Sequence, residues 1–159
     1  MNKSELIAKI RAKLEEDLKA LRAAALETYA AATGEESRPE NEYDTRALEA
    51  SYLAGAQGKR VSEIESNLTV LKFIEAKNFS DNTPIGNTAL VSLDQDGKKL
   101  MVFLIPISGG VTVQFQSQTI QIISPHSPLG EALLGLKVGD FAVVDKGSQS
   151  LEYEILKVE

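Results

Sequence analysis

The sequence contains no cysteine, no tryptophan and a single histidine among its 159 residues. Without cysteine the chain has no disulfide framework, no cysteine-based zinc site and no thiol nucleophile. One histidine excludes a histidine-cluster metal site. A Ser-His-Asp triad would have to use His126, and nothing around that residue supports such an interpretation. No apolar run approaches the length of a membrane span, so we expect no association with a membrane.

The overall composition is that of a globular protein, with 43% hydrophobic and 25% charged residues. The formal net charge is −6 and the pI is about 4.9, which argues against non-specific coating of nucleic acid. The stretch that follows Met1 is charged and amphipathic, unlike the apolar core of a signal peptide, so we expect a cytoplasmic protein. The acids are unevenly placed, since residues 35–44 hold five acids and one base.

The first half of the chain has the periodicity of two long helices. Residues 3–32 contain no glycine or proline, and apolar or small residues recur there at alternating steps of three and four. A second helix is expected to begin near Pro39 to Asn41. The first seam consists of Ile7, Ile10, Leu14, Asp17, Leu21, Ala24, Thr28 and Ala31, and the second of Ala47, Ala50, Ala54, Gln57, Val61, Ile64, Leu68 and Leu71. The pattern predicts an antiparallel coiled-coil hairpin over residues 1–77, with an acidic tip at 33–44.

The character of the seam changes along the hairpin. It is small, with Ala and Thr, beside the connecting loop and bulky, with Ile, Leu and Val, at the open end. We therefore expect a thin tip and a well-anchored base. Because the hairpin buries its own seam, a monomer is the simplest expectation.

After residue 77 the period changes to that of a sheet. Residues 78–86 have the composition of a linker, and residues 87–159 are expected to form a small sheet-rich domain. Asp96-Gly97 predicts a hairpin turn, and Ser127 followed by Pro128 predicts the start of a short helix over 127–134. The strands are expected at 87–93, 98–105, 111–115, 119–123, 141–144 and 151–158. The fold class is therefore α+β.

Two segments carry a resemblance to a known family. Glu40-Asn41-Glu42-Tyr43-Asp44 opens the second helix beside the acidic patch, and the stretch from Ser124 to Gly135 is followed by Lys137-Val138-Gly139-Asp140. With the hairpin and the sheet-rich half, these segments make the chain resemble the bacterial Gre transcription elongation and transcript-cleavage factors over nearly its whole length.

The resemblance implies a fold, a partner and a function. It implies that residues 87–159 have an FKBP-like fold and dock on the rim of the secondary channel of bacterial RNA polymerase, through His126, Ser127, Pro128 and Leu129. It also implies that the hairpin enters the channel, near the 3′ end of the nascent RNA. There the tip acids Glu35, Glu36 and Glu40 would help to hold a Mg²⁺ ion shared with the polymerase active site, so that the polymerase cleaves backtracked RNA. The resemblance further implies that the chain alone holds no metal or cofactor and that it is not itself an enzyme.

The tip departs from the family pattern G-D-x-x-E-N-A-E-Y. From Gly34 to Tyr43 it is one residue longer and contains no aspartate, so the partner of Glu40 is either Glu36 or Glu35. Asn41, Glu42, Tyr43 and Asp44 match the start of the second helix.

Three interpretations follow. In the first, the protein is a cleavage-stimulating elongation factor. In the second, which the altered tip spacing favours over a standard Gre factor, it is a cleavage-incompetent regulator or inhibitor in the same channel. The third, a prolyl isomerase or chaperone with a coiled-coil handle, has little support because the second half offers few aromatic residues for a pocket.

Overall fold

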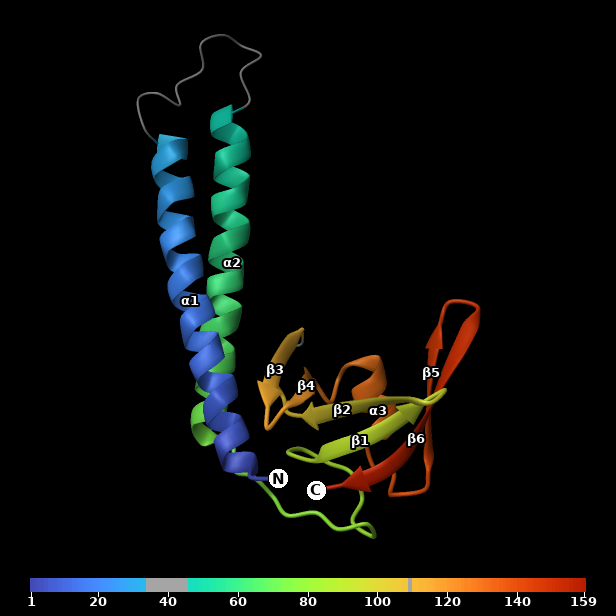
Figure 1. The fold of residues 1–159 in the computed structure, drawn as a ribbon. Helices are drawn as coiled ribbons and strands as arrows, with labels where there is room; N and C mark the ends of the chain where they lie inside the picture. The colour runs from blue at the N-terminus through green and yellow to red at the C-terminus, as the bar shows by residue number, and fades with distance from the viewer. Residues whose placement is uncertain (34–45, 109) are drawn as a thin grey trace. The chain divides into compact units, whose positions relative to one another are not determined.

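The computed structural model describes residues 1–33, 46–108 and 110–159 (Figure 1). The chain divides into two compact units. The larger unit combines Met1–Ile10 with Val70–Glu159, and the smaller unit comprises Arg11–Thr69. The acidic patch at residues 35–44, with every tip residue predicted above, lies outside the described residues.

Two long helices form the smaller unit and extend into the larger one. Helix α1 spans Lys3–Thr33 and helix α2 spans Arg46–Phe73, and the two lie side by side in opposite directions (Figure 1). Leu14 and Ile64 are buried, as the heptad seam predicts, and Leu18, beside the seam, is buried as well. Beyond them Leu21 and Ala24 are only half-buried and Leu26 is 70% exposed. The helical hairpin is thus confirmed, with its bulky contacts concentrated toward the base.

The larger unit contains a six-stranded sheet with the strand order β3-β4-β2-β1-β6-β5. Neighbouring strands are antiparallel except for β2 and β4, which run parallel. The strands are β1 (Leu90–Gln95), β2 (Lys98–Leu104), β3 (Val111–Phe115), β4 (Gln118–Ile123), β5 (Phe141–Lys146) and β6 (Gln149–Val158). Helix α3 (Pro128–Leu133) connects β4 to β5 and packs against β5.

One face of this sheet carries a continuous apolar core. Leu93 of β1, Val102 of β2 and Ile155 of β6 are at most 1% exposed, and Leu133 of α3 is fully buried with them. Because side chains alternate between the two faces of a strand, these positions share the face that α3 covers. The structure confirms an α+β fold with a long helical hairpin and a sheet; the FKBP-like description stays a prediction.

The first strand begins three residues later than its sequence suggests. The pattern predicts a strand from residue 87, whereas β1 begins at Leu90, after a turn in which Thr88 has φ = 70°. A β-branched residue rarely adopts this backbone conformation. Here contacts from both sides hold Thr88: its N–H donates to the Leu104 carbonyl at 2.7 Å, and its hydroxyl accepts from the Lys77 N–H at 2.9 Å.

A buried lysine links the start of α1 to this turn, within the larger unit. Lys3 is 7% exposed, and its ammonium donates to the carbonyl oxygens of Lys77 and Thr88, the second at 3.1 Å. The same group lies 4.8 Å from the centre of the Phe79 ring, a cation–π distance. Burial lowers the pKa of Lys3, and the nearby Glu159 carboxylate partly opposes this effect. The heptad pattern did not indicate this contact, because Lys3 precedes the seam.

Replacing Lys3 by methionine should lower the free energy of unfolding by about 1–3 kcal/mol at neutral pH, because the buried Thr88 carbonyl loses this donor. Lys9→Met, an exposed position on the same helix, should change it by less than about 0.5 kcal/mol. Denaturant unfolding of the two variants beside the unchanged protein measures both effects. Equal stability of the two variants would contradict the role assigned to Lys3.

The lowered pKa of Lys3 also predicts a pH dependence. Because the pKa of this group is lower in the folded state than in the unfolded chain, the unfolded chain binds more protons between the two values. The contribution of Lys3 to stability should therefore rise as the pH increases through this interval toward 10.5, the ordinary value. The free energy of unfolding, measured over alkaline pH, should rise less in Lys3→Met than in the unchanged protein.

Candidate functional site

Of the predicted site residues, the structure describes the segment His126–Leu129. It lies between the end of β4 and the first turn of α3, at one end of the apolar core. The tip residues Glu35, Glu36, Glu40, Asn41, Glu42, Tyr43 and Asp44 are outside the described residues, so their roles stay predictions. We refer to Ser124–Gly130 as the docking corner.

Ser127 closes the docking corner. Its backbone N–H and its hydroxyl both donate to the Ser124 carbonyl oxygen, at 3.0 and 2.7 Å. The same hydroxyl oxygen accepts a hydrogen bond from the Gly130 N–H at 3.1 Å, so Ser127 is the N-cap of α3. Pro128 occupies the first turn, where its missing N–H costs no hydrogen bond. The predicted helix start is confirmed.

Gly130 allows the corner to be this tight. A Cβ atom at this position would lie 2.0 Å from the Ser124 carbonyl oxygen and 3.0 Å from the Pro125 Cα. Any side chain would therefore push the backbone of Ser124 away from the first turn of α3. The glycine in the Ser-Pro-x-Gly stretch is thus explained by packing against the chain itself, independently of any partner.

The segment after α3 is held by a second set of backbone contacts. Gly135 and Gly139 have φ values of 82° and 88°, which favour glycine. The Asp140 carboxylate accepts from the Lys137 N–H at 2.8 Å. The Asp140 carbonyl accepts from the Ile155 N–H of β6 at 3.0 Å, and the Gly139 N–H donates to the Ile155 carbonyl at 2.9 Å. The family-like Lys137-Val138-Gly139-Asp140 stretch is therefore a turn that connects α3 to the sheet.

The docking corner presents two exposed side chains. His126 and Pro128 are exposed, whereas Ser127 and Leu129 are half-buried. The hydroxyl of Ser127 is engaged inside the corner, as donor to one backbone group and acceptor from another. A partner at this surface would therefore contact the imidazole and the pyrrolidine ring directly, while Ser127 holds their backbone in place.

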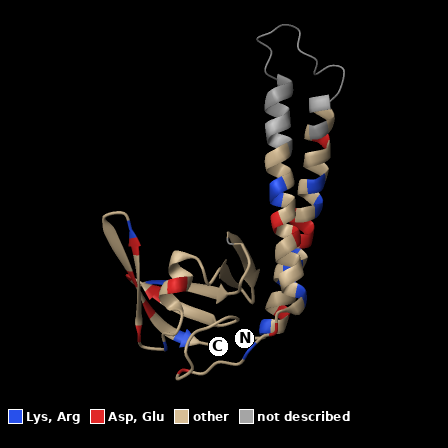
Figure 2. Cartoon of the chain, turned by 180° about the vertical axis from the view of Figure 1, so that it is seen from behind, with Lys and Arg blue, Asp and Glu red and all other residues tan. Residues whose placement is uncertain are grey.

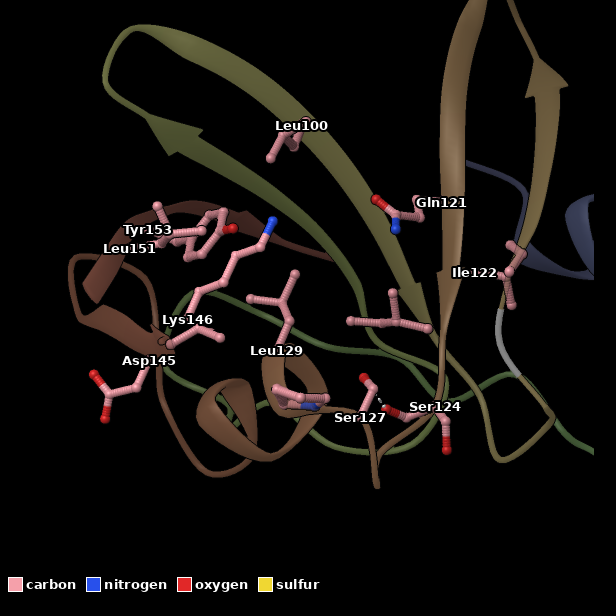
Figure 3. Close-up of a pocket in the computed structure, with 14 residues that line it drawn as sticks. Leu100, Gln121, Ile122, Ser124, Ser127, Leu129, Asp145, Lys146, Leu151 and Tyr153 are labelled. Atoms are coloured by element: carbon pink, nitrogen blue, oxygen red, sulfur yellow. Dashed lines mark hydrogen bonds between the residues drawn. The ribbon is translucent and has the colours of Figure 1, made fainter. Parts of the chain in front are cut away.

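Beside the docking corner lies a pocket of about 490 Å³ (Figure 3). Pro128 and Leu129 line one side of it together with Ser124 and Ser127, and residues of β2, β4, β5 and β6 with Gly110 line the rest. Its walls are mostly apolar, and Tyr153 is the aromatic residue among them. Sequence reasoning missed these residues, because they come from four separate strands and share no motif. The lining residues from the strands include Leu100, Gln121, Val144, Lys146, Leu151 and Tyr153.

Charged residues of both signs are mixed along the described parts of α1 and α2 (Figure 2). Several are paired: Lys13 with Asp17, Arg22 with Glu65 across the two helices, and Arg60 with Glu63. Such pairs are typical of solvated helix faces and contribute little to stability individually. Among residues 1–33, 46–108 and 110–159, no cluster of three or more metal-ligating side chains is present and no helix is long and apolar enough to cross a membrane.

Sequence comparison relates the chain to known proteins. A family model described as "Transcription elongation factor, GreA/GreB, C-term" matches residues 80–159. The protein named transcription elongation factor GreA from Thermotoga petrophila is 32% identical over 104 residues, which cover 65% of this chain and 63% of that protein. GreA from Streptococcus gordonii is 28% identical over 120 residues, which cover 75% of this chain and 69% of that protein.

Comparison of structures gives weaker likenesses. The crystal structure of Thermus aquaticus Gfh1 aligns with 93% of this chain and 92% of its own, with 22% identity and a TM-score of 0.39. The elongation factor GreA/GreB from Nitrosomonas europaea aligns with 62% of this chain and 78% of its own, with 22% identity and a TM-score of 0.37. The assignment therefore depends on the sequence match, which covers the docking corner, the turn at Asp140 and all six strands of the sheet. On this match, the chain belongs to the GreA/GreB family.

Proposed function

We propose that the protein is a transcription elongation factor that binds bacterial RNA polymerase at the rim of its secondary channel. The family match over residues 80–159 carries this proposal. The docking corner supports it, because a capped helix start with exposed His126 and Pro128 offers a preorganised surface to a protein partner. The hydrolytic active site belongs to the polymerase in this proposal, and the protein acts as its accessory factor.

The hairpin has the second role in the proposal. Its helices would extend from the docked sheet unit into the channel and bring the acids of residues 35–44 toward the RNA 3′ end. Carboxylates are ligands that Mg²⁺ prefers, so Glu40 with Glu36 or Glu35 fits a shared ion in chemical type. Such an ion assists phosphodiester hydrolysis by lowering the pKa of bound water and by neutralising charge.

A second candidate function is supported by the tip sequence. The segment from Gly34 to Tyr43 is one residue longer than the family pattern and lacks its aspartate. Ligand geometry at a metal tolerates displacements of only about 0.5 Å, so a changed spacing favours a factor that occupies the channel without supporting cleavage. Such a protein would regulate or inhibit transcription. The isomerase interpretation is disfavoured, because the pocket beside the docking corner contains one aromatic residue, Tyr153.

The docking surface can be tested with its two exposed residues. The double variant His126→Ala/Pro128→Ala should bind core RNA polymerase about tenfold more weakly, which corresponds to a loss of about 1.4 kcal/mol. Its thermal unfolding should be unchanged, since Ser127 still caps α3. Leu134→Ala, exposed beyond the end of the same helix, serves as the control and should bind normally. Equal affinity of the double variant and the unchanged protein would exclude this surface from docking.

The tip acids are tested by RNA cleavage in a stalled, backtracked polymerase complex with Mg²⁺. If the protein stimulates cleavage, Glu35→Ala/Glu36→Ala/Glu40→Ala should lose roughly tenfold or more of the stimulation while it still binds the polymerase. Retained stimulation would refute the assignment of these acids. Absence of stimulation by the unchanged protein, together with competition against a cleavage-active Gre factor, would establish the channel-occupying regulator instead.

A further inference from the structure

One face of the sheet is open at the edge formed by β5 and β6. Helix α3 covers the face to which Ala142 and Ile155 contribute, so their neighbours along each strand point to the opposite face. On that opposite face Phe141 is 53%, Val143 52% and Leu156 38% exposed. Large apolar side chains on two neighbouring strands are therefore in contact with water.

The other end of the same face is buried. Phe103 of β2 and Ile120 of β4 point to the same side of the sheet as Phe141, as the pairing of the strands shows. Both of them are fully buried. The exposure at β5 and β6 is therefore a local feature that does not extend across the whole face. An exposed apolar patch of this kind is typical of an interaction site.

Two carboxylates lie among the exposed apolar side chains. In the antiparallel pairing of β5 with β6, Glu154 lies opposite Phe141 and Glu152 lies opposite Val143, and directly opposite residues share a face. Both glutamates are exposed. Among the residues that the structure describes, no ion pair involves either of them. We refer to Phe141, Val143, Glu152, Glu154 and Leu156 as the outer patch.

The nearest basic residues on this face do not neutralise the outer patch. Asp94 of β1 lies opposite Glu154, and Lys99 of β2 lies opposite Asp94, so two strand spacings, about 10 Å, separate Lys99 from Glu154. Lys157, next to Leu156, is paired with Glu159 at 3.1 Å. The outer patch therefore presents apolar surface together with negative charge.

We propose that the outer patch binds a segment of a protein partner in which apolar side chains are flanked by lysine or arginine. The apolar side chains would cover Phe141 and Val143, and removal of this surface from water is favourable. The flanking cations would pair with Glu152 and Glu154, which selects the segment and speeds its association. The outer patch lies on the face opposite to α3, so this inference goes beyond docking through Ser124–Gly130 and adds a second binding surface.

The charge of the outer patch favours this occupant over others. Nucleic acids and anionic lipid surfaces are polyanions, which the two glutamates and the net charge of −6 repel. A second copy of the chain would bring like charges together if the two outer patches met in a symmetric contact. A segment that is both basic and apolar complements the glutamates and the apolar side chains at the same time.

The experiment adds a capped synthetic peptide, Lys-Leu-Lys-Val-Lys-Phe, to the isotope-labelled full chain and follows the backbone amide signals by NMR. Saturable shifts should centre on residues 141–143 and 152–156, with a dissociation constant of about 0.1–1 mM, the affinity of a few contacts on an open surface. The acidic counterpart, Glu-Leu-Glu-Val-Glu-Phe, should produce no saturable shifts. Equal binding of the two peptides, or shifts centred elsewhere, would overturn the inference.

Two double variants separate the contributions of charge and apolar surface. Glu152→Lys/Glu154→Lys should bind the basic peptide about fivefold more weakly at roughly 0.05 M salt, and its deficit should shrink to about twofold or less at roughly 0.5 M. Phe141→Thr/Val143→Thr should lose about fivefold at both salt concentrations, because apolar burial is not screened. Threonine suits exposed strand positions, and Leu156→Thr serves as a second apolar variant if the change in β5 prevents folding.

Glu75→Lys/Asp81→Lys is the matched control. It makes the same change of net charge at two exposed residues that lie outside the sheet. Its affinity for the basic peptide should be within about twofold of that of the unchanged protein at both salt concentrations, since neither residue is near the outer patch. Equal losses in this control and in Glu152→Lys/Glu154→Lys would show a general effect of net charge and contradict the proposed site.

Two further results would assign the outer patch to another occupant. If its amide signals shift when the chain is concentrated without peptide, the occupant is a second copy and the inference is wrong. Phe141→Thr/Val143→Thr should bind core RNA polymerase as tightly as the unchanged protein does. If the variant loses that binding, the outer patch belongs to the polymerase contact and is not a separate binding surface.

Discussion

The carbonyl oxygen of Ser124 organises the proposed docking surface. It accepts hydrogen bonds from both the backbone and the hydroxyl of Ser127, and it occupies the space where any side chain at Gly130 would have to lie. The end of β4 and the first turn of α3 are therefore locked together at one point. From this point the orientations of His126 and Pro128 and the position of Leu129 along the pocket wall follow. A surface held in this way loses little conformational entropy when a partner binds.

Local chemistry explains why much of the fold was predictable from the sequence. Heptad spacing predicted both helices of the hairpin, Asp96-Gly97 predicted the turn between β1 and β2, and Ser127-Pro128 predicted the start of α3. Each of these signals acts over a few neighbouring residues. The delayed start of β1 was missed because Thr88 adopts its unusual conformation through contacts with Leu104 and Lys77, neither of which is nearby in the sequence.

The residues of the candidate site likewise form two groups, one that the sequence predicts and one that it does not. Its loop residues were found through a contiguous family-like stretch, whereas the pocket depends on the pairing of strands. Lys146 reaches the side of Leu129 only because β5 pairs with β6 and packs against α3. The buried Lys3 has a similar origin, since its partners Lys77 and Thr88 are more than seventy positions away along the chain. The tip acids form the opposite case, in which the sequence pattern alone supports the assignment.

The strand order has a consequence for how the protein folds during synthesis. Strand β1 lies between β2 and β6, so a central strand of the sheet pairs with a segment made more than fifty residues later. The ribosome adds residues at about 5–20 per second, so β1 and β2 wait for several seconds before β6 emerges. Both helices of the hairpin precede the sheet in the chain, so Arg11–Thr69 can form helical structure in that interval. Until β6 arrives, one edge of β1 is open, and a nascent chain in this state is a natural substrate for chaperones that shield unpaired strands.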